Sequence, residues 1–465
     1  MNLNFPPFPH LAFRCGWWRR VSTGLALTCL AALTGANALA EVRLPAIFST
    51  HMVLQAGKSV PVWGWADPGE KVSVSVAGKT QHATADAQGR WRVKFSGLKA
   101  GGPFTLAVHG KNEVVVDDVL VGEVWLGSGQ SNMAQPAREA RDFATTQAEA
   151  NAPEIRMFKV ESKGATNAQS DCAGTWQVCN PETVGRFSAV LYFFGKELHA
   201  KLGGPVGLIN SSVGATAIES WISPAGQPAQ PGDGKGDLYN GKIAPLVPYG
   251  LRGIIWYQGE ANAHSAEQAR RYHGQMVALV RDWRAHWEAE LPFGWVQLPN
   301  YHERGEAWCL VREGQLQALE LPRTGMAITV DLGDAGNIHP KNKQGMAARL
   351  ALWALGTVYD RKVPATSGPL PAKTEFRRGT AVVKFQHADG GLAAREGELR
   401  GFQIAAADQM FQPATARIQG QTVIVSSPAV TQPAAVRYAW QDNPEANLVN
   451  GAGLPATPFR TDNWQ

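Results

Sequence analysis

Four short polar segments follow apolar runs of this chain and contain residue types that can perform nucleophilic or acid–base chemistry. The first segment, residues 127–133, reads Gly-Ser-Gly-Gln-Ser-Asn-Met. Its glycines permit a tight strand-to-helix turn, which would lift the Ser131 hydroxyl to the edge of a sheet. The Ser131 amide would then lie at a helix start, where developing negative charge is favoured. The alternative is an ordinary turn in which Ser131 only caps a helix.

The second and third segments offer hydrogen-bond donors. Residues 211–221 contain Gly214, whose backbone amide is sterically accessible, although a plain glycine turn explains it equally well. Residues 254–262 place Gln258 and Glu260 just past another apolar run. Gln258 can donate a neutral hydrogen bond to an oxyanion. A carboxylate near a nucleophile opposes oxyanion formation, so we expect Glu260 to pair with an arginine or to hold backbone amides.

The fourth segment, residues 331–340, contains His339 on a predicted loop between a strand and a helix. A histidine on such a loop is a good candidate for a general base, because the loop lies where substrate arrives. Four other histidines fall in or beside charged helical segments, which favours surface positions: His264, His273, His286 and His302. No His-Glu-x-x-His or comparable ligand spacing is present, so we predict no metal site.

The segments are positioned by apolar runs without alternation at residues 123–127, 207–210, 253–256, 294–298 and 326–330. Helical spacing of apolar residues is found between them, for instance at 266–288 and 342–355. Strands buried on both faces that alternate with helices predict a doubly wound parallel α/β sheet. In such sheets, ligands bind at the carboxyl ends of the strands, where all four segments fall.

Period-two alternation flanks this region on both sides. It occurs at residues 72–76, 91–95 and 104–108 before the α/β pattern, and at 381–385, 421–425 and 435–440 after it. This alternation is typical of half-buried antiparallel strands. We therefore predict a signal peptide at residues 1–40, an N-terminal β domain at 41–118, an α/β catalytic domain at 119–362 and a C-terminal β domain at 363–465, both β domains being sandwich-like.

Composition narrows the class of protein. The chain has 465 residues, 44% of them apolar and 18% charged, which excludes a disordered tail. Its net charge is +5, and the sequence contains no block of basic residues, so nucleic acid is not an expected partner.

The N-terminus has the pattern of a secretory signal. Arg14, Arg19 and Arg20 precede an apolar run at 21–33 and small residues at 38–40. The alternative, a membrane anchor, would need a longer apolar run. We predict a periplasmic or secreted protein without stable membrane insertion after cleavage.

Three cysteines remain beyond the predicted signal. In an oxidising compartment, Cys172 and Cys179 can close a small loop, which would leave Cys309 as an unpaired thiol. Three thiols this scattered make a poor zinc site.

Together the four segments resemble a known family. Gly-Gln-Ser-Asn-Met at 129–133, Trp-Tyr-Gln-Gly-Glu at 256–260, Ile-His-Pro at 338–340 and the tail at 453–462 are similar to sialate O-acetylesterases, which belong to the SGNH-type serine hydrolases. The similarity spans nearly the whole mature chain.

The resemblance implies that Ser131 is the nucleophile, that His339 is the general base, and that an oxyanion hole is built from the amides of Ser131 and Gly214 with Gln258. No metal or organic cofactor is implied. Many SGNH hydrolases have an aspartate three residues before the histidine, where this chain has Gly336. Two alternatives stay open for the third member: Asp334 curls back to the imidazole, or a backbone carbonyl orients the ring.

Four further residues are expected to bind substrate or to support the site: Gln130, Asn132, Trp221 and Glu260. Three tryptophans, Trp125, Trp221 and Trp256, border the segments and either offer flat faces to a sugar or belong to the core. The function implied is removal of O-acetyl groups from carbohydrate, most plausibly 9-O-acetylated sialic acid. One alternative is acetylated plant polysaccharide such as xylan or pectin. Another is a non-catalytic carbohydrate-binding protein.

Overall fold

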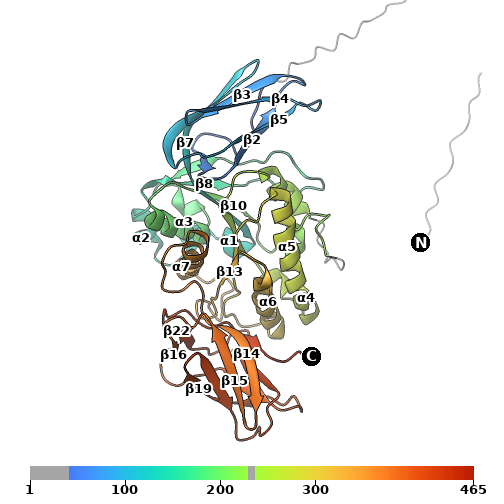
Figure 1. Ribbon diagram of the computed structural model, residues 1–465, viewed down its shortest axis with the longest axis vertical. Helices are drawn as coiled ribbons and strands as arrows, with labels where there is room; N and C mark the ends of the chain where they lie inside the picture. The colour runs from blue at the N-terminus through green and yellow to red at the C-terminus, as the bar shows by residue number, and fades with distance from the viewer. Residues whose placement is uncertain (1–40, 229–235, 465) are drawn as a thin grey trace, which may run out of the picture. The chain divides into compact units, whose positions relative to one another are not determined.

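The computed structural model describes residues 41–228 and 236–464 (Figure 1). The predicted signal segment, residues 1–40, lies outside these ranges. Within them, every helix is too short or too polar to cross a bilayer.

Alternating strands build the N-terminal β region. Side chains of β3 and β5 are buried at every second position, so one face of each strand packs into the core. β3 pairs antiparallel with β4 and β6, and β2 pairs antiparallel with β5. The bounds are β1 (Val53–Gln55), β2 (Val60–Trp65), β3 (Lys71–Val76), β4 (Lys79–Thr84), β5 (Arg90–Phe95) and β6 (Gly101–His109).

Strand β7 (Glu113–Gly129) belongs to two sheets. Its first half pairs antiparallel with β6, and its second half pairs parallel with β10 and β11. The boundary that we predict at residue 118 falls inside this strand. The N-terminal β region and the central sheet therefore share one continuous backbone.

The central sheet has the strand order β13-β12-β11-β7-β10-β8-β9. All neighbouring pairs are parallel except β8 with β9. The bounds are β8 (Ala152–Lys159), β9 (Trp176–Cys179), β10 (Val206–Ser212), β11 (Gly253–Tyr257), β12 (Phe293–Val296) and β13 (Thr324–Ala327). Each of the five predicted apolar runs overlaps one of these strands or β7, whereas β8 and β9 were not predicted.

Helices cover both faces of this sheet (Figure 1). Trp125 and Ile255 pack into the core beneath α3 and α7, whereas their chain neighbours Leu126 and Ile254 pack into the core beneath α5 and α6. Both faces are buried, which explains the unbroken apolar runs. The bounds are α1 (Ser131–Ala134), α2 (Phe143–Ala148), α3 (Ala189–Leu202), α4 (Ala266–Arg270), α5 (Tyr272–Trp287), α6 (Glu306–Gln317) and α7 (Lys343–Trp353). The helix predicted at 266–288 is divided at Arg271 into α4 and α5.

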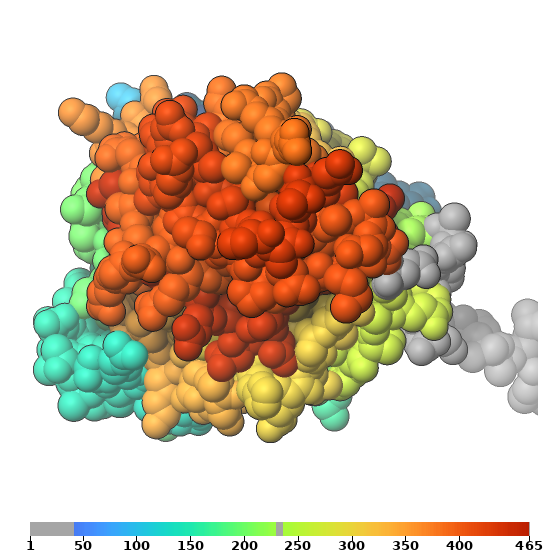
Figure 2. Space-filling view, turned by 90° about the horizontal axis from the view of Figure 1, so that it is seen from below, coloured from blue at the N-terminus to red at the C-terminus, as the bar shows by residue number. Residues whose placement is uncertain are grey.

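The C-terminal β region has a core of its own, with antiparallel sheets ordered β14-β15-β20-β19 and β18-β17-β21-β23 and a pair β16-β22. Its side chains form the continuous orange-to-red surface of Figure 2. The bounds are β14 (Leu370–Arg377), β15 (Thr380–Gln386), β16 (Leu392–Ala394), β17 (Phe402–Ala405), β18 (Gln412–Pro413), β19 (Thr415–Gln419), β20 (Thr422–Ser426), β21 (Ala435–Tyr438), β22 (Leu448–Asn450) and β23 (Phe459–Arg460). The predicted fold class, a parallel α/β sheet flanked by β regions, is confirmed.

Candidate active site

Ser131 lies at the carboxyl end of the central strand, as the first residue of α1. The turn depends on Gly129, whose φ is +134°. A Cβ at this position would lie 2.1 Å from the Tyr257 carbonyl oxygen, so only glycine allows β7 and β11 to stay paired here. The Gln130 amide then donates to the same carbonyl at 3.0 Å.

His339 reaches Ser131 from the loop between β13 and α7. Its Nε2 lies 2.8 Å from Ser131 Oγ, within hydrogen-bond and proton-transfer distance. The Asn337 side chain accepts the His339 amide at 2.9 Å and fixes the backbone at the histidine. Burial, and then the charge of Lys343, lowers the pKa of His339 below its ordinary value. A neutral imidazole, which is the form that can accept a proton, is therefore favoured near pH 7.

The structure does not bring Asp334 and His339 together. Asp334 is exposed, and its carboxylate accepts the Gly336 amide at 3.0 Å in a local turn. Among the described residues, no group hydrogen-bonds to Nδ1 of His339, whether carboxylate or backbone carbonyl. In the described residues, Ser131 and His339 therefore form a hydrogen-bonded pair without a third member.

Gly214 lies beside Ser131, two residues beyond the end of β10. A Cβ built on Gly214 would lie 3.5 Å from Ser131 Cβ. The preceding amide, that of Val213, donates to the Gly129 carbonyl at 3.1 Å and ties this loop to the serine turn. The loop therefore places the backbone of Gly214 next to Ser131, as an oxyanion donor requires.

Gln258 is buried and does not offer its amide to Ser131. Its Nε2 donates to the Thr216 carbonyl at 3.1 Å and to Asn262 Oδ1 at 2.7 Å, so both hydrogens are occupied. Its Oε1 accepts the Tyr272 hydroxyl at 2.8 Å. In this geometry, Gln258 holds the loop that contains Gly214 rather than an oxyanion.

The predicted supporting residues Gln130, Asn132 and Glu260 are all buried around the serine turn. Gln130 Oε1 accepts the Ala261 amide at 3.1 Å. Asn132 Nδ2 donates to Glu260 Oε1 at 2.5 Å. Among the described residues, no arginine pairs with Glu260. Its carboxyl group is instead influenced by the backbone amides of residues 259–260 and by the charge of Lys343.

The three tryptophans that border the segments belong to the core. Trp125, Trp221 and Trp256 are each 0% exposed. Trp221 packs edge-on against Trp256 at 6.0 Å between ring centroids, and its Nε1 donates to Thr216 Oγ1 at 3.0 Å. The indole of Trp221 therefore supports the Gly214 loop and presents no open face to a sugar.

The predicted disulfide is wrong: Cys172, Cys179 and Cys309 are free, buried thiols. Cys172 packs with the core on one side of the sheet, and Cys179 packs with the core on the other side. Trp176 and Cys179 lie three residues apart on β9 and so point to opposite faces. Strand β9 thus separates the two cysteines in place of the small loop that we expected.

Sequence reasoning missed Lys343, the first residue of α7, which is fully buried behind the serine. A lysine in the first turn of a helix opposes the helix dipole, and this was the one signal available.

Sequence reasoning also missed the loop after β12, where the Asn300 side chain accepts the Gly333 amide at 2.7 Å. His302 donates its backbone amide to the Ala335 carbonyl at 3.1 Å, so this loop supports the His339 loop.

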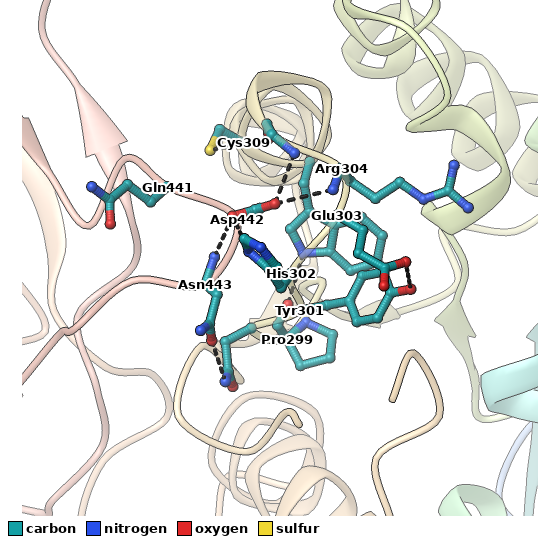
Figure 3. Close-up of polar contacts among 12 residues, drawn as sticks. Pro299, Tyr301, His302, Glu303, Arg304, Cys309, Gln441, Asp442 and Asn443 are labelled. Carbon is teal, nitrogen blue, oxygen red and sulfur yellow. Dashed lines mark hydrogen bonds and ion pairs between the residues drawn. The ribbon is translucent and has the colours of Figure 1, made fainter. Parts of the chain in front are cut away.

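The C-terminal β region holds the loop after β12 (Figure 3). Asp442 accepts the amides of Arg304 and Gly305, at 3.0 and 2.8 Å, directly before α6. Arg312, 0% exposed, donates to the carbonyls of Leu298, Pro299, Gln441 and Asp442 at 2.6–2.8 Å. The Arg304 side chain points away from Asp442, and its Nη1 lies 2.7 Å from His264 Nδ1.

Within the described residues, no three His, Cys, Asp or Glu side chains group as metal ligands. A parallel α/β sheet that brings a serine hydroxyl and an imidazole together at its carboxyl edge is the arrangement expected of a serine hydrolase. Comparison with known proteins agrees. Residues 121–352 match the family model described as carbohydrate esterase, sialic acid-specific acetylesterase.

Relatives extend this match to nearly the whole chain. The chain is 30% identical to human sialate O-acetylesterase, with 90% of this chain and 92% of the relative covered. It is 28% identical to the mouse enzyme of the same name, with 90% of this chain and 94% of the mouse enzyme covered. A solved carbohydrate acetylesterase from Xanthomonas citri is 43% identical and superimposes with a TM-score of 0.87, covering 91% of this chain and all of that one. The chain belongs to the sialic acid-specific acetylesterase family of carbohydrate esterases.

Proposed function

We propose that the chain is an exported serine esterase that removes the acetyl group from 9-O-acetylated sialic acid through an acetyl-serine intermediate. The observation that carries the proposal is the 2.8 Å contact between Ser131 Oγ and His339 Nε2. The names of the human and mouse relatives support the choice of sugar.

In the first half of the reaction, His339 Nε2 takes the Ser131 proton while Oγ attacks the acetyl carbonyl carbon. The amides of Ser131 and Gly214 stabilise the negative oxygen of the tetrahedral intermediate. The intermediate collapses with cleavage of the carbon–oxygen bond to the sugar, and the protonated His339 returns the proton to the leaving hydroxyl. In the second half, water attacks the acetyl-serine with His339 again as base, which releases acetate and restores Ser131.

Hydrolysis of p-nitrophenyl acetate tests the chemistry. We expect Ser131→Ala and His339→Ala each to lower kcat by at least about 10³-fold. Asp334→Asn should keep nearly normal activity, because the Asp334 carboxylate accepts only a local backbone amide. A wild-type protein with no activity would instead favour a non-catalytic carbohydrate-binding protein. An active Ser131→Ala variant would show that Ser131 is not the nucleophile.

A sialate substrate carries its own carboxylate, which requires a cation near the acetyl site. Arg252 does not serve, because it precedes β11 at the opposite edge and pairs with Glu123 at 2.5 and 3.0 Å. Arg304 lies on the loop after β12, at the carboxyl edge of the sheet. We expect Arg304→Met to raise KM for 9-O-acetylated sialic acid and to leave p-nitrophenyl acetate hydrolysis unchanged. The exposed Arg92, on β5 of the N-terminal β region, provides the matched control, Arg92→Met.

Acetylated plant polysaccharide is the second candidate substrate. It is favoured by the bacterial relative, which is more similar to this chain and is named a carbohydrate acetylesterase without a sialate. Acetate release from acetylated xylan beside 9-O-acetylated sialic acid distinguishes the two. Export is tested separately by the mass of the purified protein, which should begin at Glu41 after expression with residues 1–40 in a Gram-negative host.

A further inference from the structure

A buried polar cluster lies directly behind the nucleophile. Lys343 is 0% exposed, and its Nζ donates to Asn132 Oδ1 at 2.5 Å. Asn132 immediately follows Ser131 and is 1% exposed. The opposite side of the Asn132 amide contacts Glu260, which is 3% exposed. One asparagine amide thus separates a buried ammonium from a buried carboxyl group.

The Asn132 amide also joins the two halves of the catalytic pair. Its Nδ2 donates to the Ile338 carbonyl at 2.9 Å, at the peptide bond directly before His339. An ammonium can only donate hydrogen bonds, so Lys343 fixes the Asn132 oxygen toward itself and the Asn132 nitrogen toward Ile338 and Glu260. Without this constraint, the amide could turn over and release the His339 loop from the serine turn.

Few other hydrogen bonds hold the two charged groups. Within the described residues, Asn132 is the one side chain that hydrogen-bonds to Lys343 Nζ, which also lies 5.4 Å from the Tyr257 ring centroid. Glu260 Oε2 has no hydrogen-bond partner among the same residues. Buried charges with so few partners lower stability unless they compensate one another. Their burial directly behind Ser131 therefore points to a role in the site.

The charges that face His339 come from two elements besides its own loop. Burial and the charge of Lys343, on α7, lower the pKa of His339, and Glu139, on the short helix η1 (Ala137–Glu139), raises it. Burial lowers the pKa of Lys343 to about 7, although the charges of Glu260 and Glu139 raise it. Burial raises the pKa of Glu260. The hydrogen bond from Asn132, the amides of residues 259–260 and the charge of Lys343 act in the opposite direction and lower it. Asp334 and Lys341, on the loop itself, are exposed to solvent.

We propose that Lys343 and Glu260 form a charged positioning pair that acts through Asn132 to align Ser131 with His339. Neither residue touches substrate. The inference rests on the proposed function, in which Ser131 and His339 perform the chemistry.

The pH profile of kcat/KM for p-nitrophenyl acetate tests the pair, because its acid limb reports protonation of the free-enzyme base. Lys343→Met removes a positive charge that disfavours imidazolium, so the limb should move to higher pH by about 0.5–1 unit. Glu260→Gln keeps an acceptor for Asn132 but leaves Lys343 uncompensated, so the limb should move to lower pH. Opposite shifts are not expected from a purely structural role.

The double variant Lys343→Met/Glu260→Gln removes both charges, and its limb should return toward that of the wild type. Its kcat should stay about 10-fold or more below wild type, because the Asn132 amide is no longer oriented. Lys341→Met, which removes an exposed charge two residues away, is the matched control and should leave the limb unmoved. Thermal unfolding monitors the fold, and if Lys343→Met does not fold, Glu260→Gln and the double variant decide.

The inference is overturned if the acid limb stays in place in both single variants, or moves in the same direction in both, while Ser131→Ala is inactive. An inactive wild type or an active Ser131→Ala would instead overturn the proposed function. The two failures are therefore distinguishable.

Discussion

We expect the substitution Gly214→Ala to lower the esterase activity without changing the stability of the fold. The new Cβ would lie 3.5 Å from Ser131 Cβ, an ordinary van der Waals contact, and Gly214 has no positive φ. We therefore expect the free energy of unfolding to change by no more than about 0.5 kcal/mol. The added methyl group, however, would lie beside Ser131, where we expect it to narrow the space for the acetyl group. A misplacement of about 1 Å costs on the order of 10²-fold in rate, or about 2.7 kcal/mol of transition-state stabilisation.

The assay is kcat/KM for p-nitrophenyl acetate together with urea unfolding. Gly204→Ala is the matched control, because Gly204 precedes the same strand at its other end, has no positive φ and has open space around a built Cβ. Both variants should unfold like the wild type, and only Gly214→Ala should lose activity. Activity within twofold of wild type in Gly214→Ala would refute the placement of the oxyanion site beside Gly214.

Three further predictions concern the thiols and the C-terminal β region. Because burial raises the pKa of Cys172 and Cys179 to about 12 and that of Cys309 to about 11, native protein without residues 1–40 should not react with Ellman's reagent, and dithiothreitol should leave its Tm unchanged. Burial raises the pKa of Asp331, but Arg349 and Arg395 outweigh it and the net pKa is lowered. The stability that the ionised Asp331 contributes is present above about pH 4 and is lost as pH falls through the folded pKa. Arg395→Gln should therefore lower the free energy of urea unfolding by about 0.5–1 kcal/mol at pH 7 and by less at pH 3. Asp442→Ala removes the acceptor of two amides before α6 and should cost about 1–2 kcal/mol in the same assay, whereas Asn443→Ala should cost less.

The fold was predictable where burial leaves a simple pattern. Residues 253–256 are apolar throughout because β11 is covered on both faces, and residues 72–76 alternate because β3 is covered on one. β8 was missed because its first three residues, Ala152–Glu154, are partly or fully exposed and mask the buried run behind them. The break at Arg271 was missed because the apolar spacing continues across it.

The site was predictable where a residue type is tied to a strand end. Ser131 and His339 meet as expected because parallel strands bring their carboxyl ends to one edge. The partners of buried polar groups were not predictable, because they depend on side chains that tertiary packing brings together. Gln258 is drawn to Thr216 and Asn262, which the sequence alone cannot select from among other acceptors.

The absence of a carboxylate at His339 Nδ1 in the described residues changes how the imidazole must be aligned. In a triad, a side chain orients the ring directly. Here the loop itself is held at several points: Arg349 and Arg395 pair with Asp331, Asn300 accepts the Gly333 amide, and Asn132 donates to the Ile338 carbonyl. Arg395 belongs to the C-terminal β region, so that region contributes to the alignment of His339 on the loop after β13. A backbone fixed in this way leaves the ring little freedom except rotation about its own side-chain bonds, which the contact with Ser131 Oγ then restricts.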